Sequence, residues 1–305
     1  MDIDDFKIDV YIPSLRKTVQ FSQINNRVYK NILKYTQTKK DINIEKYLSN
    51  MVDALSTSIK SDDINKIDLF CILLTLRIVC IGPAIDLQFK CKKTKKPFNT
   101  SVDLNDILQK FTDIGEVTQT TVHLDDDIAV KLGIPSRLYT DDNDMLDTMT
   151  YCVTDIDIKG NKYNLSTLAP REKKNIINKL PGKVFNYIVR YANNIQSEFN
   201  KLVVLSEKSP HDKDSHVEEH RLGLYNNSMF NFIRLIYADN LIGYYEMLYT
   251  LSSNINMSAT YVESITPAEA GIFLATRRKE VARQEQAQRS HENKNKGPSL
   301  PDRMN

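Results

Sequence analysis

The 305-residue chain has no tryptophan and only nine glycines. Neither GxGxxG nor GxxxxGKS/T occurs among them, which argues against a glycine-rich phosphate loop. The net charge of +2 provides no general attraction to nucleic acid or membrane. Hydrophobic and charged contents of 41% and 26% are typical of an ordinary folded protein. A chain of this length buries a sizeable core, and one or two domains are expected.

Long hydrophobic runs are also lacking. The longest, Leu69 to Ile81, contains Arg77 and is shorter than the roughly 20 residues that span a bilayer. The acidic start, Met1 to Asp5, is followed by no apolar run, so no signal peptide is expected. These patterns predict a protein without a membrane partner.

Cysteine is scarce, with four residues whose spacings match neither a zinc knuckle nor a CxxC redox motif. Cys71 and Cys80 lie in an apolar helical pattern and are predicted to be small core residues. Cys91 opens a lysine-rich turn, but Thr94 stands where a second thiolate ligand would be needed. We therefore expect no metal and no cofactor.

The apolar patterning predicts an α+β fold, with helical N- and C-terminal parts, a small β-rich insertion in the middle and an N-terminal β-hairpin. Alternation from Ile8 to Phe21 around Pro13-Ser14 indicates that hairpin. The predicted parts are residues 1–83, the hairpin plus three helices; 84–168, a β-rich middle domain with a lysine-rich hairpin; 169–276, a helical part packing on the N-terminal helices; and 277–305, a polar helix end and flexible tail.

Helical spacing and capping signals predict where along the sequence the helices lie. The first three are predicted to start after Ser22, after Asp41 and at Asp62-Asp63, and the third is nearly all apolar and therefore central. Later helices are expected from Pro170, over 184–202, over 229–251 and from the capping sequence Thr266 to Glu269. Strands are predicted at 84–89, 98–104, 116–124, 128–132 and in a hairpin over 153–165.

One pentapeptide, His216-Val217-Glu218-Glu219-His220, matches the zinc peptidase pattern HxxEH. On a helix, His216 and His220 would face the same way and hold zinc, with Glu219 as general base. The preceding segment is hydrophilic, and no second motif supplies a third ligand. The sequence favours the solvated start of a charged helix and keeps a zinc-dependent hydrolase as an alternative.

The turn over residues 90–96 contains five lysines. Lysines bind phosphates, but no aromatic residues are interleaved for base stacking. An exposed hairpin tip is favoured. A contact to an acidic protein partner is the second alternative and a nucleic-acid-binding factor the third; no nucleic acid is expected. The residues predicted to contact a partner lie here and at the basic start of the last helix segment: Lys92, Lys93, Lys95, Lys96, Arg277, Arg278 and Lys279.

Acidic clusters are interpreted as structural. Asp155 to Gly160 starts like a calcium loop, but Lys159 and Ser166 occupy two ligand positions, so the hairpin explains these residues better. The clusters at 125–127 and 141–144 are predicted to be solvated turns, with an interaction surface as the alternative.

Four segments taken together resemble a known family: Ile12 to Leu15, Leu69 to Ile78, Cys91 to Phe98 and Leu132 to Ser136. In this order they resemble the T-even-like phage baseplate hub proteins, whose named hub subunit is often described as a hub assembly chaperone. The resemblance extends over residues 8–275, through the order of elements as much as the letters.

This resemblance implies a non-enzymatic hub component or hub assembly factor of a contractile-tailed phage. Its expected partners are other baseplate hub or tail proteins. The expected location is the host cytoplasm during assembly, with the virion tail baseplate as a second location.

Overall fold

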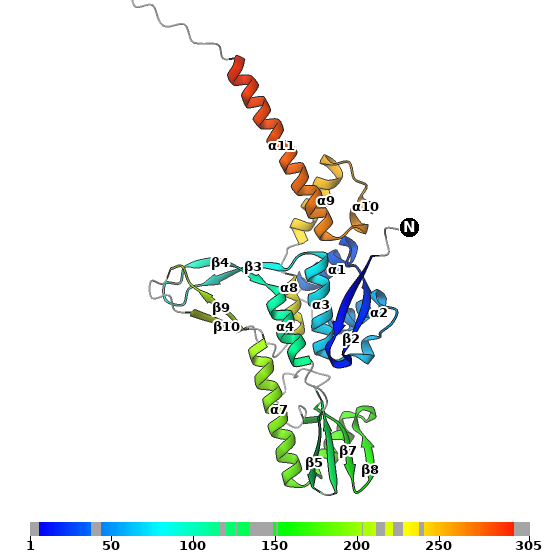
Figure 1. Ribbon diagram of the computed structural model, residues 1–305. Coiled ribbons are helices and arrows are strands. Elements are labelled where there is room, and N and C mark those ends of the chain that lie inside the picture. The colour runs from blue at the N-terminus through cyan, green and yellow to red at the C-terminus, as the bar shows by residue number, and fades with distance from the viewer. Residues whose placement is uncertain are drawn as a thin grey trace, which may run out of the picture. The chain divides into compact units, whose positions relative to one another are not determined.

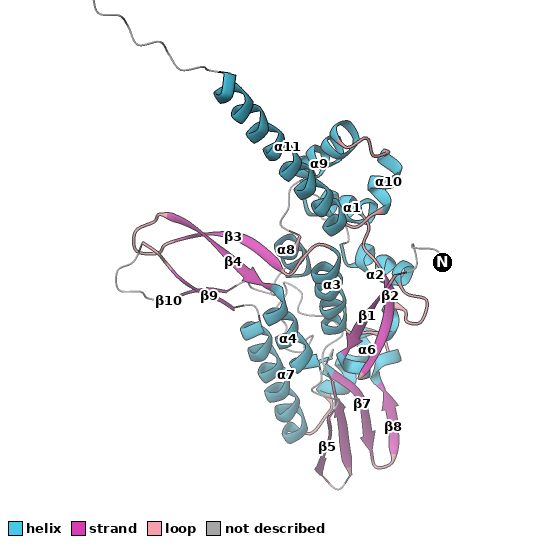
Figure 2. Cartoon of the chain, turned by 45° about the horizontal axis from the view of Figure 1, so that its top comes forward, coloured by secondary structure: helices cyan, strands magenta, loops and turns pink. Residues whose placement is uncertain are grey.

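The computed structural model describes residues 6–37, 44–115, 120–125, 127–133, 149–150, 152–202, 204–211, 217–221, 228–237 and 241–295 (Figures 1 and 2). Helices and small antiparallel sheets alternate along these residues, and a hairpin opens the chain, which confirms the predicted α+β class. The chain forms two compact units. The larger contains residues 1–23 and 35–238, and the smaller contains 24–34 and 239–305. The four domain boundaries expected from the sequence stay a prediction.

The elements of the larger unit are β1 (Lys7–Ile12), β2 (Lys17–Ser22), α2 (Ile44–Leu55), α3 (Lys66–Cys80), β3 (Ala84–Lys90), β4 (Pro97–Asp103), α4 (Leu104–Gly115), β5 (Thr120–Asp125), β6 (Ile128–Leu132), β7 (Val153–Ile158), β8 (Asn161–Asn164), α6 (Pro170–Asn178), α7 (Gly182–Leu202), β9 (Val204–Lys208), β10 (Val217–Arg221) and α8 (Ser228–Ile236). The smaller unit contains α9 (Leu241–Asn254), α10 (Ala259–Ser264) and α11 (Pro267–Asn295). Helix α1 (Asn26–Gln37) starts in the smaller unit and ends in the larger.

The first hairpin is anchored to the central helix α3 by a buried carboxylate. Asp68 accepts hydrogen bonds from the backbone N–H of Ser14 at 3.0 Å, from the Ser14 hydroxyl at 2.6 Å and from the N–H of Asn65 at 2.9 Å. The Asn65 side chain in turn accepts from Ile67 and Asp68, which makes a capping box. Helix α3 therefore starts at Lys66, not at the predicted Asp62-Asp63, because Asn65 satisfies its first N–H groups.

A buried arginine holds the other end of the central helix. Arg77 donates from Nε to the carbonyl of Ile236 in α8 at 2.6 Å, and its guanidinium also bonds to the carbonyls of Gly82 and Ala84. Burying a charge is unfavourable unless its donors are satisfied, and here backbone oxygens satisfy them. Arg77 interrupts the apolar run of α3 because it joins three chain segments.

Helix α4 was absent from the predicted elements. Its buried side chains, Leu104, Ile107 and Phe111, recur at helical spacing directly after β4. Its last residue, Gly115, lies against the first hairpin: a Cβ there would be 2.5 Å from Pro13 Cβ and 3.1 Å from Ile67 Cγ2. Glycine is required at this position because the proline ring and the isoleucine side chain occupy the space.

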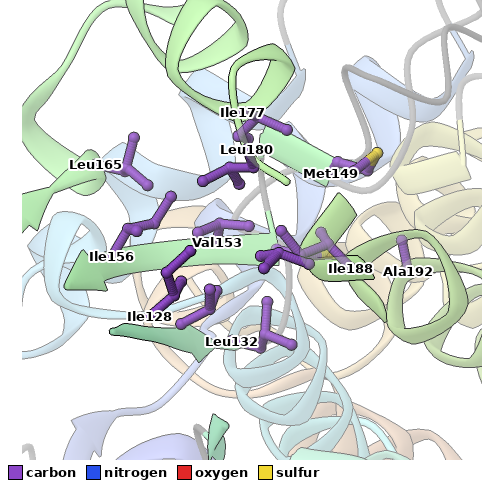
Figure 3. Close-up of a cluster of buried hydrophobic side chains, with 13 residues drawn as sticks. Ile128, Leu132, Met149, Val153, Ile156, Leu165, Ile177, Leu180, Ile188 and Ala192 are labelled. Atoms are coloured by element: carbon purple, nitrogen blue, oxygen red, sulfur yellow. The ribbon is translucent and has the colours of Figure 1, made fainter. Parts of the chain in front are cut away.

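The middle sheet has the order β5-β6-β7-β8, all antiparallel. Strands β7 and β8 confirm the predicted hairpin, and its turn residues Lys159 and Gly160 both have positive φ. Helices α6 and α7 contribute to the buried cluster of this sheet (Figure 3). The buried members of the cluster are Ile128, Val130, Leu132, Met149, Cys152, Val153, Ile156, Leu165, Ile177, Leu180, Val184, Ile188 and Ala192.

The smaller unit joins two distant parts of the sequence. The backbone N–H of Asn26 donates to the carbonyl of Ile265, and its side-chain amide donates to the carbonyl of Val262, each at 2.8 Å. Glu263 forms ion pairs with Arg27 and Lys30. A small buried cluster of Leu251, Val262, Ile265 and Ala270 completes this unit.

Three further predictions about helices, besides the start of α3, are wrong. The first helix starts at Asn26 because Ser22 is the last residue of β2. The single helix expected over 229–251 is two helices, α8 and α9, which belong to different units. Residues 204–208 and 217–221 are paired strands, not the start of a charged helix, because the ladder between β9 and β10 satisfies their backbone groups.

Candidate partner-binding surfaces

Two hairpins of the larger unit, β3–β4 and β9–β10, extend side by side and form what we call the paired-hairpin arm, residues 84–103, 204–211 and 217–221 (Figures 1 and 2). The lysine-rich turn is the end of the first hairpin. A ring nitrogen of His211 lies 3.1 Å from the carbonyl oxygen of Pro97 and links the second hairpin to it. The structure thus brings together two segments more than a hundred residues apart.

Cys91 organises the lysine-rich turn. Its N–H donates to the carbonyl of Lys96 at 2.9 Å, and the N–H of Lys95 donates to the Cys91 carbonyl at 2.8 Å. Lys95 adopts a positive φ of 59° to close the turn. The N–H of Thr94 donates to Cys91 Sγ at 3.4 Å. These hydrogen bonds give the backbone of the lysine-rich turn a defined shape.

The Cys91 sulfur also fastens the two hairpins together. Hydrogen bonds from the Ser209 hydroxyl and from Thr94 lower the pKa of the Cys91 thiol, because they favour the thiolate. Ser209 is buried, and its Oγ accepts from the N–H of His211 at 3.2 Å. Through these hydrogen bonds Cys91 joins the lysine-rich turn to the second hairpin.

The turn presents its lysines to solvent. Lys92, Lys93, Lys95 and Lys96 are all exposed, whereas Cys91 is buried beneath them. Residues 87–102 of this hairpin include no Asp or Glu. The end of the arm is therefore a positively charged surface on a hydrogen-bonded frame.

A second exposed surface is the distal part of α11. Arg278 and Lys279 are exposed, and Arg277 pairs with Glu280 at 3.3 Å. Every residue described by burial from 278 to 291 is exposed. Residues 277–295 have six Lys or Arg and three Glu, so this segment is positively charged. A polar, unpacked helix of this kind is stabilised by its own side-chain pairs or by a partner.

The HxxEH pattern is not on a helix. Glu219 and His220 belong to β10, opposite Ser206 and Leu205 of β9, and His216 lies outside the described residues. The i, i+4 helical geometry of the zinc hypothesis is therefore absent over Val217 to Arg221. Within the described part of the chain, no three His, Cys, Asp or Glu residues cluster as metal ligands do.

The other acidic candidates have structural roles or fall outside the structure. Asp155 lies on β7 and pairs with Lys131 at 3.6 Å, and Lys159 pairs with Asp127 at 3.8 Å. The hairpin interpretation of residues 155–160 is thus confirmed. The cluster at 141–144 lies outside the described residues, as does Asp126 in the cluster at 125–127.

Comparison with models of known protein families identifies the class of protein to which the chain belongs. A family model described as T4 bacteriophage base plate protein matches residues 5–202, well over half of the chain. The chain therefore belongs to this family of phage baseplate proteins, which confirms the resemblance to T-even-like baseplate proteins drawn from its ordered segments. Searches of curated proteins and of solved structures found no match.

Family membership gives the protein a structural or assembly role in the baseplate of a phage tail, together with other tail and baseplate proteins. In the described residues, no helix has the length and apolar character needed to cross a bilayer. The family match ends at Leu202, before β9, β10 and all of α8 to α11.

Proposed function

We propose that this protein is a non-enzymatic component or assembly factor of the baseplate hub, acting through protein–protein contacts. The paired-hairpin arm carries the proposal, because it presents exposed Lys92, Lys93, Lys95 and Lys96 on a hydrogen-bonded frame. Such a surface complements an acidic surface of a hub or tail protein. The segment of α11 that starts at Arg277 and exposes Arg278 and Lys279 is a second contact. The protein acts in the host cytoplasm while the baseplate is built.

Charge reversal at the tip of the arm tests this proposal. Lys92, Lys93, Lys95 and Lys96 are changed together to Glu, and association with the phage's hub proteins is measured by co-expression and affinity purification. We expect recovery of hub proteins to fall by about tenfold or more, because exposed charges steer and orient partners. Circular dichroism should remain unchanged, since all four side chains are exposed.

A matched control changes four exposed lysines away from the arm, Lys110, Lys162, Lys179 and Lys183, to Glu. The two variants have the same net charge, so a loss confined to the tip variant supports a specific contact. Equal recovery of hub proteins with both variants contradicts the proposed role of the tip. Salt-dependent retention of the wild type on DNA, lost only in the tip variant, would favour nucleic acid instead.

A further inference from the structure

The second hairpin of the arm contacts the lysine-rich turn at both of its ends. Strands β9 and β10 run beside β3 and β4 (Figures 1 and 2). Cys91 starts the segment of exposed lysines, and Pro97 follows it. The Ser209 hydroxyl hydrogen-bonds to the Cys91 sulfur, and a ring nitrogen of His211 lies 3.1 Å from the Pro97 carbonyl oxygen. We call Ser209 and His211 the clamp pair.

The hydrogen-bonding capacities of the clamp pair make its two contacts compatible. Ser209 Oγ accepts from the N–H of His211 at 3.2 Å, so the single hydrogen of this hydroxyl is donated to the Cys91 sulfur. A carbonyl oxygen only accepts, so the His211 ring nitrogen is the donor to Pro97. Pro210 lies between the two residues, and its ring fixes φ there. The clamp pair is therefore one connected group.

The contact between Cys91 and Ser209 is buried. The two residues are 0% and 3% exposed, so water does not replace the hydroxyl when Ser209 is changed. Cys91 also takes part in three hydrogen bonds within the turn, through its N–H, its carbonyl and its sulfur. A shift of Cys91 therefore changes the shape of the whole lysine-rich turn.

We propose that Ser209 and His211 are positioning residues of the lysine-rich turn, which hold it in the shape that an acidic hub or tail protein binds. This inference rests on the proposed function, because it concerns the same surface. A backbone that is fixed before binding loses less conformational entropy when the partner binds. When the held shape is less populated, the apparent affinity of the partner falls with it.

The clamp pair lies in a part of the chain that the family match does not include. The match extends over residues 5–202, with the lysine-rich turn inside it, whereas β9 starts at Val204. In this chain, a surface of the family-matched region therefore depends on a hairpin outside that region. The β9–β10 hairpin thereby controls partner binding without supplying the charges that attract the partner.

Removal of each clamp side chain tests the proposal. Ser209→Ala and His211→Ala are made separately in the full chain, and hydrogen–deuterium exchange of the backbone amides of residues 91–96 is measured. We expect the Thr94 and Lys95 amides to exchange faster by about threefold or more, because the turn opens more often. Recovery of hub proteins in co-purification should also fall by about threefold or more, although every lysine of the turn is kept.

Two control variants lie away from the arm. Ser56→Ala removes a buried serine hydroxyl that bonds to the carbonyl of Gln20, and His123→Ala removes an exposed histidine on β5. Both should leave exchange in the turn and recovery of hub proteins as in the wild type. Ser56→Ala therefore separates loss of a buried hydrogen bond from loss of this particular contact.

A conservative change distinguishes positioning from direct contact. His211→Gln keeps a side-chain N–H donor, so it should restore slow exchange in the turn and recovery of hub proteins together. Reduced recovery without faster exchange in either clamp variant would show that the side chain touches the partner itself. That result overturns the positioning role.

A double-mutant comparison tests whether Ser209 acts through Cys91. Adding Ser209→Ala to Cys91→Ala should cause no further loss of hub proteins, because the sulfur that receives the hydroxyl is already absent. A further loss as large as the one that Ser209→Ala causes in the wild type overturns the proposed path.

The two proposals fail differently. Wild-type exchange and wild-type recovery of hub proteins in both clamp variants overturn the positioning role and leave the hub role intact. Absence of the wild-type chain from every hub or tail complex overturns the proposed function itself.

Discussion

Asp68 joins the first hairpin to the start of helix α3. It is fully buried and accepts from Ser14 twice and from Asn65 once. Asp68→Ala leaves three donors without an acceptor, so the free energy of unfolding should fall by about 3 kcal/mol. Urea unfolding followed by circular dichroism measures this loss. Asp62→Ala, at an exposed position nearby, should cost less than about 0.5 kcal/mol; equal losses would contradict the role of Asp68.

Glu263 makes the smaller unit sensitive to acid. The hydrogen bond from Lys30 and the neighbouring Arg27 lower the pKa of Glu263 below its ordinary value of 4.5. Because the folded-state pKa is lowered, this stabilisation is fully present above the unfolded pKa and is lost as pH falls through the folded pKa.

Glu263→Gln tests that linkage. The variant should unfold at a lower temperature than the wild type at neutral pH, and the difference should shrink below the ordinary glutamate pKa of 4.5. Thermal unfolding over about pH 3 to 8 gives the comparison. A difference that stays constant with pH would show that the charge of Glu263 contributes nothing.

At the scale of elements, the end of α4 is packed against the first hairpin without spare space. Gly115→Ala places a Cβ against the rigid Pro13 ring and Ile67, so the free energy of unfolding should fall by about 1–3 kcal/mol. Gly271→Ala is the matched control, because it also lies in a helix and its Cβ would meet nothing within 4 Å. It should be neutral or stabilise the protein by up to about 1 kcal/mol. Chemical unfolding of both variants decides whether the contact is as close as described.

A helix or strand could be predicted when its sequence pattern was local, that is, carried by neighbouring residues alone. The first hairpin, the β3–β4 hairpin and the β7–β8 hairpin alternate in sequence, and all three are confirmed. Helix α4 has equally local spacing in Leu104, Ile107 and Phe111, which the strand pattern just before it obscured. Strands β9 and β10 are charged, and only their pairing with each other distinguishes them from a polar helix.

At the scale of the whole molecule, deletion of residues 277–305 should separate folding from association. The basic part of α11 is exposed from Arg278 to His291, so its removal should leave circular dichroism per residue and unfolding temperature close to those of the wild type. Recovery of hub proteins in co-purification should fall, because Arg277, Arg278 and Lys279 are lost. Unchanged recovery would count against a binding role for this segment.

Local patterns determined the α+β class, the three alternating hairpins, the central helix and the ordered segments that indicate the baseplate family, because each depends on residues close in sequence. Tertiary structure decided which distant segments meet: Ser14 with Asp68, Ser209 with Cys91, and Asn26 with Val262. It also decided that Ile242, Tyr245 and Tyr249 of α9 lie in water while the opposite face of the same helix, with Tyr244 and Leu251, is buried. Apolar composition alone does not distinguish these two faces, because burial is a property of what packs against a helix.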